Sequence, residues 1–169
     1  MKTTKPVLYI FSGLPAVGKS SLAKLLAREI CASYIRVDTI EQGLRDLCSC
    51  KVEGEGYRLA YRTAADNLKL GISVVSDSCN PWTLTRREWE NLAIENRAEF
   101  INIEVLCSDE DEHRKRAENR IAEIEGLNLP SWEEIRKRDY HPWNKEIITV
   151  DTAGKTVRQS FEELVSKIC

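Results

Sequence analysis

The residues best suited to chemistry stand in one run near the start of the sequence, from Gly13 to Ser20. The run follows the spacing G-x-x-x-x-G-K-[ST], in which backbone amides cradle the phosphates of a nucleotide. Lys19 would reach the β- and γ-phosphates, and the Ser20 hydroxyl would ligate Mg²⁺. The run and its next neighbour therefore predict a phosphate-binding set: Gly13, Leu14, Pro15, Ala16, Val17, Gly18, Lys19, Ser20 and Ser21.

The segments on both sides of this run are the ones such a loop needs. An apolar run of strand type, 7–11, precedes it, and Leu22, Leu25, Leu26 and Ile30 follow at the spacing of one helix face. Glycine is about 7% of residues, so the four fixed positions coincide by chance in fewer than roughly one chain in a hundred of this size. We therefore interpret the run as a P-loop (Walker A) rather than as an ordinary glycine turn.

The rest of the sequence alternates apolar strands with amphipathic helices, which is typical of an α/β fold with a mainly parallel sheet. Within the helices, Trp89 and Leu92 are expected in the core, and Arg86 and Arg87 are expected to face solvent or substrate. The expected strands are 7–12, 34–37, 72–77, 100–106 and 147–150, and the expected helices are 19–31, 57–70, 83–97 and 156–168.

Two acids stand where predicted strands end. In open α/β sheets, residues beyond the carboxyl ends of the strands line the ligand crevice. Asp38 follows the second strand and has three open interpretations: a general base toward a substrate hydroxyl, a substrate or metal contact, or a helix N-cap. Asp77 ends the third strand, as in a Walker B strand, and would hold Mg²⁺ through water while polarising Ser20. Asn80 follows in the same crevice and is a candidate substrate contact.

Three arginines are candidate anion ligands. Arg45 lies on the helix after Asp38 and would bind an anionic substrate, or is simply a solvated helix charge. Arg116 and Arg120 are four residues apart in a highly charged segment, so a helix there would carry both on one face. Arginine suits phosphate and transition-state charge because its planar fork donates several hydrogen bonds. The alternative is a solvated helix held by pairs of opposite charge.

Composition sets the broad class. The chain has 169 residues, 31% charged, and a net charge of -2. We expect one domain, 1–169, in which 112–142 forms a lid over the crevice. The lack of a basic excess argues against nucleic acid, although 136–138 offers a local basic patch. No membrane segment or leader is expected, and we expect a cytoplasmic protein, monomeric or homodimeric. Six scattered cysteines favour reduced thiols over a metal site: Cys31, Cys48, Cys50, Cys79, Cys107 and Cys169.

Taken together, the P-loop, the strand that leads to Asp38, the stretch Val74–Asn80, the arginines and Asp151–Gly154 resemble the small P-loop kinases. These are predicted AAA-type kinases related to gluconate kinase, adenylylsulfate kinase, chloramphenicol phosphotransferase, zeta toxins and the kinase domain of polynucleotide kinase. The resemblance implies a three-layer P-loop NTPase fold, a five-stranded parallel sheet of order 2-3-1-4-5 between helices, with a mobile lid. It also implies ATP and Mg²⁺ as the phosphoryl donor.

The resemblance further implies roles for single residues. Lys19 and Ser20 would take the phosphates and Mg²⁺, Asp38 the base or substrate position, and Asp77 the Walker B-like position. Arg116 and Arg120 would be lid arginines at the nucleotide. The turn at 151–154 would approach the adenine through Thr152 and Gly154. The sequence departs from better-characterised members in the lid and after Asp38, the parts that choose the acceptor.

The function expected from this sequence is that of an ATP-dependent kinase, a transferase that moves the ATP γ-phosphoryl group to a hydroxyl of a small molecule. Lys19, Asp38 and Arg116 are its expected catalytic residues. An alternative is a polynucleotide 5′-kinase or a toxin-like kinase of a nucleotide sugar. A nucleotide-binding regulatory switch is the alternative without enzymatic activity. A GTPase is disfavoured because the stretch 144–147, Asn-Lys-Glu-Ile, lacks the acid of the N-K-x-D guanine motif.

Overall fold

The structure is a computed structural model that describes residues 5–168. Its centre is a five-stranded sheet in which every neighbouring pair is parallel and the strand order is β2-β3-β1-β4-β5. The strands are β1 (Val7–Ser12), β2 (Ser33–Arg36), β3 (Val74–Asp77), β4 (Glu99–Leu106) and β5 (Ile148–Asp151). The expected fold class and strand order are therefore confirmed.

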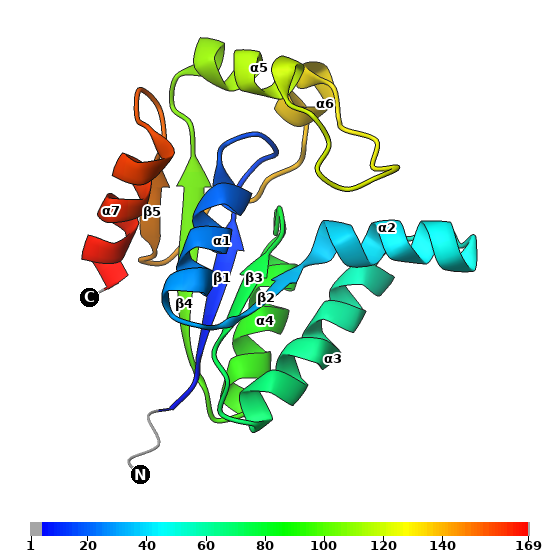
Figure 1. Ribbon diagram of the computed structural model, residues 1–169, viewed down its shortest axis with the longest axis vertical. Coiled ribbons are helices and arrows are strands. Elements are labelled where there is room, and N and C mark those ends of the chain that lie inside the picture. The colour runs from blue at the N-terminus through cyan, green and yellow to red at the C-terminus, as the bar shows by residue number, and fades with distance from the viewer. Residues whose placement is uncertain (1–4, 169) are drawn as a thin grey trace.

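Helices cover both faces of the sheet (Figure 1). The helices are α1 (Lys19–Glu29), α2 (Val37–Cys48), α3 (Glu55–Lys69), α4 (Thr83–Glu95), α5 (Glu110–Asn119), α6 (Trp132–Arg136) and α7 (Val157–Ile168). Side chains alternate across β1, so Tyr9 and Phe11 pack with α1 and α7 while Leu8 and Ile10 pack with α3 and α4. This alternation produces the three layers.

The loops that matter for function gather at one edge of the sheet. Because all strands are parallel, the segments after β1, β2, β3, β4 and β5 leave from the same side. Helices α5 and α6 lie over this edge, and the connection between them extends toward α2 (Figure 1). The chain thus places the P-loop, the start of α2 and the segment 112–142 around one region.

The structure differs from the sequence predictions in the ends of several elements and in the burial of Arg86. The predicted elements exist, with ends displaced by a few residues, and Trp89 lies in the core as expected. Arg86 was expected to face solvent or substrate but is only 3% exposed, because it is enclosed by aromatic rings and carbonyl groups. Arg87 is exposed.

Between residues 5 and 168, no helix has the length and apolar character required to cross a membrane. The five cysteines in that range are free thiols, and Cys169 lies outside it.

Candidate functional site

The P-loop joins β1 to α1 with a backbone that only certain residues tolerate. Gly13 has a φ of 145°, and a Cβ there would lie 2.2 Å from the carbonyl oxygen of Val105. Its amide donates to the carbonyl of Cys79 over 3.1 Å, which ties the loop to the turn after β3. Gly18, with a φ of 91°, is the N-cap of α1. The loop therefore brings unpaired amides of a helix N-terminus to the edge of the sheet, which is an anion site.

Lys19 and Asp77 form a buried ion pair beneath the loop. Lys19 Nζ lies 2.9 Å from Asp77 Oδ1, with side chains 9% and 1% exposed. The Tyr34 hydroxyl donates to the other carboxylate oxygen over 2.6 Å. Burial alone raises the pKa of Asp77, but Lys19 and the hydrogen bonds from Tyr34, Lys19 and Ser20 outweigh it and hold this pKa below the ordinary value. Asp77 is therefore held in its ionised form next to the P-loop lysine.

The same balance keeps Lys19 charged. Burial lowers the pKa of the Lys19 ammonium, and the charges of Asp77 and Asp38 more than offset this effect, so the pKa is raised. Both acids that the sequence singled out therefore act on the P-loop lysine.

The residues at this point fit Mg²⁺ in one arrangement. Ser20 lines the cleft and offers its hydroxyl, which is a hard oxygen ligand. Both oxygens of Asp77 already accept hydrogen bonds, from Lys19 and Tyr34, and Asp77 does not line the cleft. Ser20 would hold the ion directly, and Asp77 would act on it from behind Ser20.

A cleft of about 850 Å³ opens between the P-loop, the start of α2 and the segment after α5. Most of the predicted site residues line it: Leu14, Pro15, Ala16, Gly18, Lys19, Ser20, Ser21, Asp38, Arg45, Arg116 and Arg120. The predicted residues that do not line it are Gly13, Val17, Asp77, Asn80, Thr152 and Gly154. Most residues that the sequence motifs singled out therefore line a single cleft.

Asp38 lies in the first turn of α2 and lines the cleft. The interpretation of Asp38 as an N-cap is wrong, because Arg36 is the N-cap residue and α2 begins at Val37. Within residues 5–168, the Asp38 carboxylate has neither a hydrogen bond nor an ion pair. It is therefore free to accept a proton or a hydrogen bond from a molecule in the cleft.

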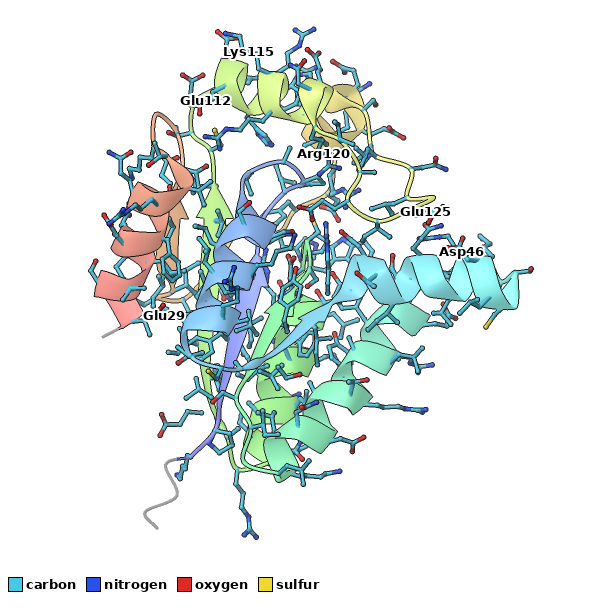
Figure 2. The ribbon with its side chains drawn as sticks, viewed as in Figure 1. Glu29, Asp46, Glu112, Lys115, Arg120 and Glu125 are labelled. Atoms are coloured by element: carbon cyan, nitrogen blue, oxygen red, sulfur yellow. The ribbon has the colours of Figure 1, made fainter. Side chains whose placement is uncertain are left out.

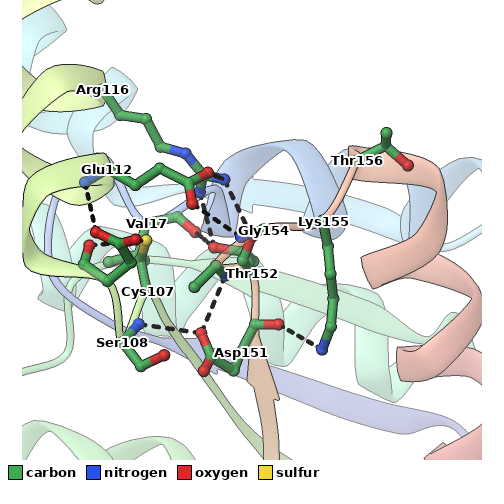
Figure 3. Close-up of polar contacts among 12 residues, drawn as sticks. Val17, Cys107, Ser108, Glu112, Arg116, Asp151, Thr152, Gly154, Lys155 and Thr156 are labelled. Atoms are coloured by element: carbon green, nitrogen blue, oxygen red, sulfur yellow. Dashed lines mark hydrogen bonds and ion pairs between the residues drawn. The ribbon is translucent and has the colours of Figure 1, made fainter.

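The two arginines of the charged segment diverge. Arg116 donates to Thr152 twice, to Oγ1 over 2.8 Å and to the carbonyl over 3.0 Å, and it also pairs with Glu112. Thr152 in turn donates to the carbonyl of Val17 in the P-loop over 2.8 Å (Figure 3). Arg116 therefore belongs to a network that joins α5, the turn after β5 and the P-loop, in which Thr152 has a linking position.

Arg120 does not share a helix face with Arg116. It is the C-cap of α5, with extended backbone, because the helix ends at Asn119. Its guanidinium lies in the field of Asp38, Arg36 and Arg138 instead. Figure 2 shows Arg120 at the end of α5, above the region between the P-loop and α2.

Asn80, predicted as a substrate contact, does not line the cleft. It is fully buried with a φ of 50°, its amide group donates to Ser12 Oγ over 3.0 Å, and its backbone N–H donates to the Tyr57 hydroxyl. Arg86 holds the same turn, since its Nε donates to the carbonyl of Asn80 over 3.0 Å. Asn80 therefore shapes the turn that supports Gly13.

No sequence motif pointed to Glu123, which connects the segment after α5 to the sheet. Its carboxylate accepts from Lys24 over 2.6 Å and from Arg36 over 2.8 Å. Arg36 also faces Asp77, its register partner on β3, with 3.8 Å between Nε and Oδ2. The contact of Arg36 with Asp77 follows only from the register in which β2 pairs with β3, which the sequence does not specify. Glu123 stands among other charged residues, so nothing in the sequence distinguishes it.

Comparison with known proteins identifies the family. The family described as AAA domain matches residues 8–139, more than half of the chain. No curated protein matches the sequence.

Solved structures share the fold across nearly the whole chain. A candidate kinase from Chloroflexus aurantiacus is 23% identical with a TM-score of 0.71, covering 97% of this chain and 96% of that one. The APS kinase CysC of Mycobacterium tuberculosis, in complex with AMPPNP and APS, is 16% identical with a TM-score of 0.70, covering 97% and 98%. Kti12 of Chaetomium thermophilum, in complex with ADP-AlF3, is 21% identical with a TM-score of 0.68, covering 96% and 99%. These likenesses confirm the fold that the resemblance to the small P-loop kinases implied.

Proposed function

This chain belongs to the AAA domain family, and we propose that it is an ATP-dependent kinase that phosphorylates a hydroxyl group of a small molecule. One observation carries the proposal. Lys19 of the P-loop and the unpaired carboxylate of Asp38 line the same cleft from different elements, α1 and α2. A phosphate-binding wall that faces a free base is the arrangement that phosphoryl transfer to an alcohol requires.

The proposed reaction begins with an exchange of partners at Lys19. The ammonium leaves Asp77 and binds the β- and γ-phosphate oxygens, next to the amides at the start of α1. Asp77 keeps the hydrogen bond from Tyr34 and the nearby charge of Arg36. Mg²⁺ held at Ser20 would supply neutralisation of charge on the phosphates.

Asp38 then positions the acceptor. Its carboxylate accepts the hydroxyl proton while the hydroxyl oxygen bonds to the γ-phosphorus and the bond from that phosphorus to the β–γ bridging oxygen breaks, which leaves ADP. Arg116, anchored on Thr152 and lining the cleft, would stabilise charge on the phosphoryl group. The segment 112–142 would act as the lid that excludes water.

The test measures ATP consumption and product formation by the pure protein with Mg²⁺ and a panel of sugars, sugar acids, nucleosides and 5′-hydroxyl oligonucleotides. We expect one class of alcohol to accelerate ATP consumption, and Asp38→Asn to abolish that acceleration while ATP still binds. Arg87→Gln, an exposed change on α4, is the matched control and should behave like the wild type. Tight ATP binding without stimulation by any acceptor would favour a nucleotide-binding switch instead.

A further inference from the structure

Guanidinium groups crowd the end of the cleft that holds Asp38. Four arginines line it: Arg36, Arg45, Arg120 and Arg138. Two of them have acidic partners nearby. Arg45 lies 3.3 Å from Glu41, and Arg36 lies 2.8 Å from Glu123.

The other two act on carboxylates only from a distance: Arg138 on Glu41 and Glu134, and Arg120 on Asp38. Among the described residues, Arg120 and Arg138 donate no side-chain hydrogen bond and form no ion pair. The Nε of Arg120 is buried and remains without an acceptor. A buried donor without an acceptor is destabilising, and more so when the group is charged. A ligand that offers an acceptor to Arg120 would therefore be stabilised there.

The positive charges of Arg36 and Arg138 also favour an anion beside Arg120. Burial lowers the pKa of Arg120, and the neighbouring Arg36 and Arg138 lower it further, while only Asp38 acts in the opposite direction. An anion between Arg120 and Arg138 would satisfy the free donors and reduce the repulsion among the three guanidinium groups. The planar fork of arginine matches phosphate, sulfate and carboxylate.

This anion site is separate from the place of the nucleotide phosphates. Arg116 donates to Thr152, which is hydrogen-bonded to the P-loop, so Arg116 belongs to the nucleotide end of the cleft. Arg120 lies four residues further along, beyond the end of α5, in the field of Asp38. Arg116 and Arg120 therefore belong to different sets of contacts within the one cleft.

We propose that Arg120 and Arg138 bind an anionic group of the acceptor, a phosphate, sulfate or carboxylate, while the acceptor's hydroxyl lies at Asp38. This inference rests on the proposed function and narrows its substrate class to small anionic alcohols. A small molecule is favoured over a polymer because the segment 120–131 bridges the cleft. Glu123 pairs with Lys24, and a Cβ on Gly126 would lie 3.0 Å from the side-chain nitrogen of Gln42. Figure 2 shows the same segment passing over α2 near Asp46.

The test uses the whole chain with its nucleotide site filled by Mg²⁺ and AMPPNP, so that an added anion cannot report on the P-loop. Inorganic sulfate is titrated calorimetrically, against potassium chloride at equal ionic strength. We expect sulfate to bind once per chain, and Arg120→Gln or Arg138→Gln to weaken it about tenfold to a hundredfold, the effect of losing a charge-assisted hydrogen bond. Arg87→Gln should leave the affinity unchanged.

Further probes identify the kind of anion and of molecule. Inorganic phosphate and D-gluconate represent the phosphate and carboxylate classes, and neutral sorbitol should not bind. A 5′-hydroxyl oligonucleotide that binds far more tightly than sulfate through the same arginines would overturn the choice of a small molecule.

Two outcomes separate this inference from the proposed function. Equal sulfate affinity in the wild type and in the double variant Arg120→Gln/Arg138→Gln, or no binding beyond that of chloride, would overturn the anion site and leave the kinase proposal standing. Failure of the wild type to bind AMPPNP would overturn the kinase proposal itself. Binding of AMPPNP by each variant also shows that the variant is folded, and Arg138 is exposed, so its replacement should not disturb the fold.

Discussion

Replacing Lys19 with alanine should destabilise the fold as well as remove phosphate binding. The change leaves the Asp77 carboxylate, 1% exposed, without the ammonium that lies 2.9 Å away. Removal of one partner from a buried pair costs about 3–5 kcal/mol, because the remaining charge is not compensated. Tyr34 still donates to Asp77 over 2.6 Å and Arg36 remains at 3.8 Å, so we expect the lower end of that range, about 3 kcal/mol.

Urea unfolding of four proteins measures this effect: the wild type, Lys19→Ala, Asp77→Asn and the double variant. Each single change strands one buried charged group, whereas the double variant strands neither. The free energies lost in the single variants should therefore exceed the loss in the double variant, with a coupling of about 2 kcal/mol or more. Lys24→Ala, on the same helix but in an exposed pair with Glu123, is the control and should cost no more than about 1 kcal/mol.

The pH dependence gives a second measurement. The pKa of Asp77 is lower in the folded chain than its ordinary value of 3.8, so its ionisation stabilises the fold above that value, and this stabilisation is lost as the pH falls through the folded pKa. Without Lys19, burial raises the pKa of Asp77 with less opposition. At neutral pH the variant therefore keeps a buried charge that lowers its stability, and protonation of Asp77 at lower pH removes that charge. The stability gap between the wild type and Lys19→Ala should therefore narrow from about pH 7 to pH 4. Losses that simply add in the four proteins, together with a constant gap across pH, would refute the reasoning.

Three further changes test the supports of the site. Gly13→Ala should abolish nucleotide binding and cost about 3 kcal/mol or more of stability in a denaturation assay, because the new Cβ would lie 2.2 Å from the carbonyl oxygen of Val105 at a φ of 145°. Arg86→Met should lower the free energy of unfolding by about 2–4 kcal/mol, since carbonyl groups and two aromatic rings lose a buried cation; an unchanged melting temperature would contradict this. Glu123→Gln should change stability by less than about 1 kcal/mol, because its pairs with Lys24 and Arg36 are partly exposed, yet it should speed proteolysis within 120–131 by releasing that segment.

Local pattern was sufficient to predict the sheet and the phosphate-binding wall. The P-loop depends on residues adjacent in sequence, Gly13 to Ser20, and its glycines have the positive φ that the spacing implies. Strand order followed from the resemblance to a family rather than from periodicity, since alternation of strands and helices fits several orders. For Lys19 and Asp77, the sequence predicted that both lie near the phosphates and that Asp77 acts on Mg²⁺. It did not predict the ion pair between them.

The parts that the sequence could not predict depend on contacts between distant segments. Arg86 lies on a helix among polar neighbours, and only the return of Tyr140 and Trp143 over it makes it a buried residue. Arg120 was grouped with Arg116 because helix periodicity was extended one residue too far, to the C-cap of α5. A difference of one residue at a helix end thus separates the Arg120 guanidinium from Thr152, which Arg116 contacts, and places it in the field of Asp38.

The surroundings of Asp77 explain how a lysine can be both buried and available. A buried ammonium that released its only partner would leave a bare carboxylate, and phosphate binding would have to offset that cost. Asp77 instead accepts hydrogen bonds from Lys19 and Tyr34 and has the guanidinium of Arg36 3.8 Å away as a further charge. When Lys19 turns to a phosphate, the hydroxyl of Tyr34 and the charge of Arg36 still compensate the carboxylate. Arg36 is itself held by Glu123 of the segment that bridges the cleft, so the ease of releasing Lys19 depends on whether that segment is in place. Weakening of AMPPNP affinity in Tyr34→Phe, with little change in the exposed Arg87→Gln, would be the signature of this arrangement.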